Sequence, residues 1–142
     1  MESVEIVRSI LIHFQNGEVE AGFALLDDDA LMACPFSPPP TRNRWHGRAE
    51  IEPICRRFFG GLFEHFEWLE MNLEQGRDPA MVFGTGRSRG VTADKRVYEN
   101  EYAWKFVVRD GKVAEYWEWF NPLVTISFFD LESQDDLNLA TS

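Results

Sequence analysis

The residues best suited to chemistry lie near the end of the sequence, around a glutamate in an aromatic segment. Glu118 alternates with Tyr116 and Phe120, the spacing that places side chains on one face of a strand. A carboxylate among apolar side chains has a raised pKa and exchanges protons near neutral pH. Glu101, on the preceding predicted strand, would share a proton with it, Tyr116 would donate a hydrogen bond to a substrate oxygen, and Phe120 would line the pocket. The alternatives are a structural Glu118 bonded to a loop or an arginine, a solvated Glu101 and a Tyr116 that belongs to the core.

The sulfur and imidazole side chains are weaker candidates. Cys34 and Cys55 have neither the spacing of metal ligands nor the density of a disulfide scaffold, and they are typical of small buried residues. His46 directly precedes Gly47 and would add a titrating group at the mouth of a pocket, the alternative being a histidine on a surface loop. The three histidines form no zinc motif, and the sequence has no glycine-rich phosphate loop. We therefore expect neither a metal nor a cofactor.

The composition argues against several kinds of partner. The 142 residues are 44% hydrophobic and 14% aromatic, enough for one core but not for a second domain. The net charge of −10 argues against nucleic acid and against anionic membrane surfaces. No run has the length of a membrane span, and the opening segment MESVEIVRS lacks the basic start and apolar stretch of a signal peptide. We expect a single cytoplasmic domain over residues 1–142.

The hydrophobic periodicity predicts the elements that position these side chains. Three helices and one strand come first, and four further strands follow in an antiparallel arrangement, which indicates an α+β fold. A proline-rich segment from Ser37 to His46 is expected to be an ordered loop. The acidic tail after residue 129 is expected to be loosely ordered. The predicted helices cover residues 3–17, 19–26 and 47–61, and the predicted strands cover 30–36, 65–75, 81–89, 97–109 and 112–120.

The last two strands carry a strong hairpin signal, Asp110-Gly111. Counting residues away from a two-residue turn assigns the faces of both strands. One face then carries three tryptophans, which we interpret as core or as the surface of a homodimer formed through the sheet. The other face mixes carboxylates with aromatic residues, as in a pocket lining. A β-bulge would exchange these assignments. The first face holds Trp104, Trp117 and Trp119, and the second holds Glu101, Tyr116, Glu118 and Phe120.

Two long runs resemble a known superfamily. The runs Leu25–Ile51 and Asp78–Leu123, especially Tyr98-x-Asn100-x-Tyr102 and the segment DGKVAEYWEWFNPL, are similar to the SnoaL-like and phenazine-biosynthesis A/B-like branches of the nuclear transport factor 2-like superfamily. The resemblance implies a cone-shaped α+β barrel, with a curved, mostly antiparallel sheet wrapped around three N-terminal helices. In both branches a functional carboxylate lies in a segment resembling the one around Glu118, which the resemblance therefore implies as a general acid/base.

The residues that assist such a carboxylate in related enzymes are missing here. Against the ketosteroid isomerases of this superfamily, the catalytic aspartate falls on Cys34, the oxyanion tyrosine on Ile10 and the second acid near Ala103. These replacements argue against steroid-type isomerisation through those residues. Cys34 is thereby a candidate pocket residue, with an inert buried thiol as the alternative. The histidine of the phenazine A/B-type proteins falls on Ile54.

These observations leave three functional hypotheses. The first is a cofactor-independent enzyme of the isomerase, cyclase or dehydratase type, acting by acid/base chemistry on an apolar, polyketide-like or cyclic substrate. The second is a non-catalytic protein that binds an apolar small ligand, which Glu118 orients. The third is a structural dimer module whose cone is filled by side chains. A Glu118 that points into a dry pocket beside a second polar group would favour the first.

Overall fold

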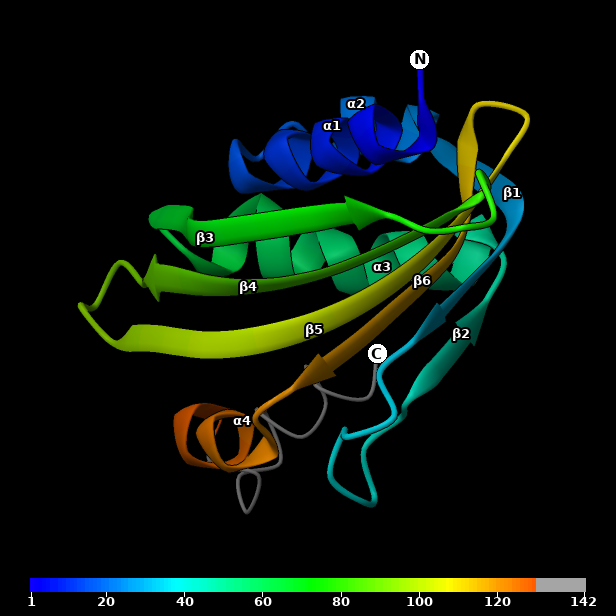
Figure 1. Ribbon diagram of the computed structural model, residues 1–142. Helices are drawn as coiled ribbons and strands as arrows, with labels where there is room; N and C mark the ends of the chain where they lie inside the picture. The colour runs from blue at the N-terminus through cyan, green and yellow to red at the C-terminus, as the bar shows by residue number, and fades with distance from the viewer. Residues whose placement is uncertain (130–142) are drawn as a thin grey trace.

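Six strands form one mixed sheet in the computed structural model, which describes residues 1–129 (Figure 1). The strand order is β2-β1-β6-β5-β4-β3, and β1 runs parallel to β6 while all other neighbours are antiparallel. The predicted α+β fold with a curved, mostly antiparallel sheet is confirmed, although the sheet stays open instead of closing into a barrel. The elements are α1 (Ser3–Gln15), α2 (Val19–Ala24), β1 (Leu26–Ala33), β2 (Arg44–His46), α3 (Arg48–Arg57), η1 (Phe58–Leu62), β3 (His65–Gln75), β4 (Met81–Val91), β5 (Val97–Arg109), β6 (Lys112–Phe120) and α4 (Pro122–Phe129).

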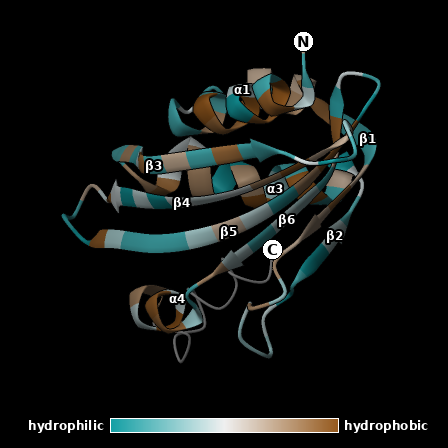
Figure 2. Cartoon of the chain, viewed as in Figure 1, coloured by the Kyte–Doolittle hydropathy of each residue, from teal (hydrophilic) through white to brown (hydrophobic). Residues whose placement is uncertain are grey.

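Helix α1 closes one end of the concave side of the sheet (Figure 1). Its apolar residues recur at helical spacing and are buried, while the intervening polar residues face outward, so hydrophobic and hydrophilic segments alternate along it (Figure 2). Gly17, with φ +72°, follows the helix in the left-handed conformation that glycine adopts without steric cost. The buried residues of α1 are Ile6, Val7, Ile10, Leu11 and Phe14.

The third helix changes its geometry where it meets the pocket. After α3 ends at Arg57, the chain continues for five residues as the π-helix η1. A π-turn rotates the following side chains relative to an α-helix. Phe58 and Phe59 belong to η1, and both line the pocket.

Three elements differ from the sequence-based prediction. The first strand, expected over 30–36, spans Leu26–Ala33 and so includes the three aspartates that were expected to precede it. Part of the expected loop from Ser37 to His46 forms β2, which pairs antiparallel with the end of β1 because Trp45 anchors it in the core with 3% exposure. The chain after β6 forms α4, with Pro122 in the first turn, where its missing N–H costs no hydrogen bond. Hydrophobic residues predominate in α4 (Figure 2). The predicted loosely ordered tail lies outside the described residues.

The main core fills the space between α1, α3 and the concave face of the sheet. A second cluster joins α4 to β5 and η1 through Tyr98, Phe128 and Phe129. None of the helices in residues 1–129 has the length and apolar character needed to cross a membrane. The assignment of the whole chain to a single domain stays a prediction.

Candidate functional site

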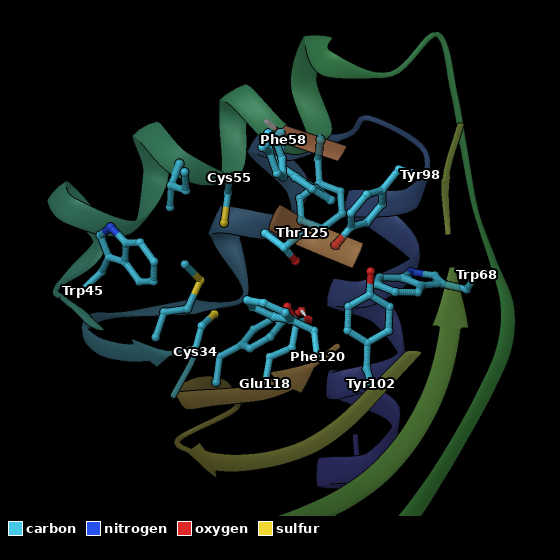
Figure 3. A pocket seen from close by; sticks show the side chains of 15 residues that line it. Cys34, Trp45, Cys55, Phe58, Trp68, Tyr98, Tyr102, Glu118, Phe120 and Thr125 are labelled. Carbon is cyan, nitrogen blue, oxygen red and sulfur yellow. Dashed lines mark hydrogen bonds between the residues drawn. The ribbon is translucent and has the colours of Figure 1, made fainter. Parts of the chain in front are cut away.

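A cavity of about 130 Å³ lies between the concave face of the sheet and the helices α3, η1 and α4 (Figure 3). Its walls are almost entirely aromatic or aliphatic, and the few polar groups among them are one carboxylate, hydroxyls and two thiols. Such a lining is typical of sites for small apolar ligands. The lining residues are Met32, Cys34, Trp45, Ile54, Cys55, Phe58, Phe59, Trp68, Tyr98, Tyr102, Tyr116, Glu118, Phe120, Thr125 and Phe129.

Glu118 is the carboxylate of this cavity, and β6 directs it inward (Figure 3). Its Oε1 atom accepts hydrogen bonds from the Trp104 indole nitrogen at 3.1 Å and from the Tyr116 hydroxyl at 3.4 Å. The other oxygen, Oε2, accepts no hydrogen bond from the described residues. The side chain keeps some accessible surface, which it presents to the cavity. One oxygen is therefore held in place and the other is available to a ligand.

Burial raises the pKa of Glu118 from 4.5 to about 7, and the hydrogen bonds from Trp104 and Tyr116 offset only part of this effect. A group with such a pKa is present in both protonation states at neutral pH, as a general acid/base must be.

The other titratable groups of the cavity stay neutral at this pH. Burial, reinforced by the nearby charge of Glu118, raises the pKa of the Cys34 thiol well above its ordinary range and that of Cys55 to about 12. Burial likewise raises the pKa of Tyr98 to about 12 and that of Tyr116 well above its ordinary value. Thiolate chemistry at Cys34 is not supported, because the thiol stays protonated.

The predicted face assignment of the last hairpin is wrong beyond its first residues. The Asp110-Gly111 turn forms as predicted, with positive φ at both residues. Beyond it Val108 pairs with Val113 but Val107 pairs with Glu115, so Ala114 is an extra residue in β6. This β-bulge shifts the register by one and exchanges the faces of the rest of the strand.

The exchange of strand faces separates Glu118 from one expected partner, Glu101, and places it beside another residue, Trp104. Glu101 lies on the exposed outer face, opposite Arg87, and not beside Glu118, so the two carboxylates share no proton. Trp104, expected with the other tryptophans, is instead paired with Glu118 inside. Trp117 and Trp119 remain together on the outer face, where their rings stack at 5.8 Å.

His46 is the second predicted pocket residue that the structure places elsewhere. Along β2 the side chains alternate, so that buried Trp45 lines the cavity while His46 is exposed. The backbone N–H of His46 donates to Glu50 Oε1 at 2.8 Å. The predicted residues that do line the cavity are Cys34, Tyr116, Glu118 and Phe120.

The sequence-based reasoning did not assign Tyr98, Tyr102 and Thr125 to the pocket, although all three line it. A signal for two of them was present, because Tyr98 and Tyr102 share the even-numbered face of β5 with Trp104. Thr125 lies on α4, and no pattern in the sequence indicated that helix.

The comparison with known families and structures agrees with this architecture. The sequence profile of the SnoaL-like domain matches residues 7–116. The chain therefore belongs to the SnoaL-like domain family of the nuclear transport factor 2-like superfamily, as its sequence predicted. An uncharacterized PhzA/B-like protein of Pseudomonas aeruginosa is 26% identical over 121 residues, covering 82% of this chain and 84% of that protein.

Solved structures of similar fold include proteins described with several activities. A proposed isomerase from Bacillus subtilis superposes with a TM-score of 0.77 at 20% identity, covering 89% of this chain and 91% of that one. A proposed polyketide cyclase from Pseudomonas putida has a TM-score of 0.75 at 18% identity, with 90% and 98% coverage. A phenazine biosynthesis-related protein from Pseudomonas aeruginosa has a TM-score of 0.70 at 15% identity, with 89% and 82% coverage. At these identities the likeness defines the fold and not the reaction.

The indole that holds Glu118 depends on a glycine in the neighbouring strand. A Cβ on Gly86 would lie 2.4 Å from the Trp104 ring and 2.8 Å from the carbonyl oxygen of Glu70. We expect Gly86→Ala to displace Trp104 and to destabilise the fold by about 1 to 3 kcal/mol, as overpacked cores do, which urea denaturation measures. Gly61→Ala is the control, because a Cβ there meets nothing within 4 Å. Equal stability of both variants would contradict this role of Gly86.

Proposed function

We propose that this protein is a cofactor-independent enzyme that moves a proton on an apolar, cyclic or polyketide-like small molecule, with Glu118 as general acid/base. The observation that carries the proposal is the Glu118 carboxylate in an apolar cavity, with a pKa near 7 and one oxygen free of hydrogen bonds from the described residues. The reaction type is an isomerisation, cyclisation or dehydration, since each begins with removal of a proton from carbon.

The proposed step balances without any further reagent. Glu118 Oε2 takes a proton from a carbon next to a carbonyl group, the C–H electron pair becomes the double bond of an enolate, and Glu118 becomes a neutral acid. Where the substrate has a C=C bond next to that carbon, the enolate is a dienolate, and return of the same proton to the far end of the dienolate shifts the C=C bond and restores the carboxylate. The raised pKa supports both halves, because a group that must take and then return a proton works best when its pKa lies near the working pH.

Proton exchange at carbon tests the proposal without knowledge of the natural substrate. The probe is β-tetralone, a two-ring ketone with exchangeable protons beside its carbonyl. In D2O the protein is expected to accelerate the incorporation of deuterium at these carbons, measured by mass spectrometry, and the acceleration is expected to depend on Glu118. Binding of β-tetralone with exchange no faster than in buffer would contradict catalysis.

A second candidate is a binding protein with the same pocket. It is favoured by Ile54, an apolar residue at the position where the phenazine A/B-like resemblance implies a catalytic histidine, which lines this cavity. In such a protein Glu118 orients the ligand and no chemistry follows. Tight binding of the ketone without exchange is the result that separates this candidate from the enzyme. The cytoplasmic location stays a prediction from the sequence.

We also propose that two copies associate through the outer face of the sheet. Trp117 and Trp119 stack on that face, with Lys105 Nζ 4.8 Å from the Trp117 ring. Stacked indoles that stay half-buried on an outer sheet face are typical of interfaces. Trp119→Glu is expected to shift the dimer toward monomer in sedimentation equilibrium, whereas Leu123→Glu, which replaces an apolar residue 73% exposed on α4, leaves it unchanged. A monomeric wild-type protein would refute this interface.

A further inference from the structure

Two tyrosine hydroxyls form a second polar group of the cavity. Tyr98 and Tyr102 come from the same face of β5, and both hydroxyls point into the cavity where the Glu118 carboxylate also points (Figure 3). The pKa of each tyrosine is affected by the hydroxyl of the other, and that of Tyr98 also by the hydroxyl of Thr125, so the three hydroxyls lie near one another. Each tyrosine also has a fixed partner in the wall behind it, and these partners decide where its proton goes.

Asn100 is the fixed partner of Tyr98. Its Oδ1 atom accepts backbone N–H groups from Glu101 at 2.8 Å and from Asn121 at 2.9 Å. Two N–H donors on one atom identify it as the oxygen and fix the orientation of the amide. The Nδ2 atom therefore donates to the Tyr98 hydroxyl oxygen at 2.8 Å. Since this oxygen already accepts a hydrogen bond, the Tyr98 proton is available on the cavity side.

Ser88 is the fixed hydrogen-bond partner of Tyr102. The two hydroxyl oxygens are 2.6 Å apart, and Ser88 is 1% exposed with no other side-chain hydrogen bond among the described residues. If Tyr102 donated to Ser88, the serine proton would be buried without an acceptor, which is costly. Ser88 therefore donates to Tyr102, and the Tyr102 proton points away from Ser88, toward the cavity and the Tyr98 oxygen, where a ligand carbonyl can accept it.

We propose that the hydroxyls of Tyr98 and Tyr102 form a hydrogen-bond donor site for a carbonyl oxygen, so that the ligands of this protein are ring ketones or enones. The proposal deepens the function proposed above and rests on it. Asn100 and Ser88 are the positioning residues of this site. Burial raises the pKa of both tyrosines, which keeps them protonated as donors throughout the neutral range.

The two polar groups of the cavity then have complementary tasks. The tyrosines hold the carbonyl oxygen while Glu118 Oε2 removes a proton from the adjacent carbon. As the C–H electron pair moves into the new double bond, negative charge develops on the carbonyl oxygen. Two phenol donors in a water-poor cavity stabilise this charge more than the neutral ketone, which is the requirement for catalysis.

The vibrational frequency of a bound carbonyl reports the site directly. With β-tetralone as probe, binding to the wild-type protein is expected to lower the C=O stretching frequency, and Tyr98→Phe or Tyr102→Phe is expected to abolish part of the shift. Each variant is also expected to weaken β-tetralone binding roughly 3- to 10-fold without changing the affinity for tetralin, which has the same carbon skeleton and no oxygen. Tyr116→Phe is the matched control, because it removes a phenol hydroxyl from the cavity but not from the pair, and it keeps the shift.

Other outcomes are equally informative. Ser88→Ala, which leaves both tyrosine rings intact, is expected to reduce the shift partially and replaces Tyr102→Phe as the test if that variant does not fold. An unchanged carbonyl frequency in Tyr98→Phe, Tyr102→Phe and Ser88→Ala overturns the donor site. The Glu118 proposal fails separately, because it predicts deuterium exchange, whereas the carbonyl shift depends on the tyrosines and is expected to persist in Glu118→Gln.

Discussion

Replacement of Glu118 by Gln is expected to slow deuterium exchange into β-tetralone by about 10² to 10⁴-fold, the usual contribution of a positioned general base. The substitution is nearly isosteric, and the amide oxygen can still accept from Trp104 and Tyr116 as Oε1 does now. What it removes is the ability to take a proton at Oε2. The loss therefore measures proton transfer and not packing.

A glutamate on the other side of the same strand provides the control. Glu115 belongs to β6 but lies on the outer face, where it accepts a hydrogen bond from Trp117 at 2.8 Å. Glu115→Gln is expected to leave the exchange rate unchanged. For the wild-type protein the rate is expected to rise with pH around the Glu118 pKa of about 7, because only the ionised form is a base. A flat profile, or equal rates in Glu118→Gln and wild type, would refute the assignment.

The same carboxylate is expected to make stability depend on pH. The pKa of Glu118 is about 7 in the folded protein against 4.5 for the free side chain. Below the lower value Glu118 is protonated in both states and costs nothing. Between the two values the unfolded state ionises while the folded state stays protonated, so the folded state loses stability relative to the unfolded state, on the order of 3 kcal/mol once the pH has passed 7. Stability contributed by the neutral acid is thus lost as the pH rises.

Glu118→Gln removes this penalty because the amide does not ionise. The variant is expected to be close to wild type in stability at about pH 4.5 and more stable by on the order of 3 kcal/mol at about pH 8. Urea denaturation at both pH values measures the difference. Glu115→Gln, which removes a carboxylate from the outer face and not from the cavity, is the control. A difference between Glu118→Gln and wild type that is the same at both pH values would show that Glu118 has an ordinary pKa in the folded protein.

The exchange assay and the denaturation experiment together separate the catalytic role of Glu118 from its effect on stability. If Glu118 fixes a ligand without chemistry, the stability difference remains and the exchange does not occur. If Glu118 is an enzyme's base, both effects appear together and share one pKa. Natural active sites often lower stability in this way, because a buried charge is kept for its reactivity.

The sequence by itself determined most of the elements and their order, with β2 and α4 as the exceptions. The apolar spacing of α1, the alternation in β5 and the Asp110-Gly111 turn are local patterns, and each formed where it was predicted. The resemblance around Glu118 identified the family, and the family profile confirms it. These features depend on neighbours within a few residues, which is the range over which backbone propensity and side-chain periodicity act.

Only the tertiary structure decided which side chains share the cavity. The bulge at Ala114 lies where β1 also changes its register against β6, between Leu26 and Leu31. No glycine, proline or other turn residue at this position indicates the bulge in the sequence. Because side chains alternate with period two, one extra residue turned Glu118 away from Glu101 and toward Trp104. The site that Glu118 forms with the tyrosines of β5 follows from that single shift in register.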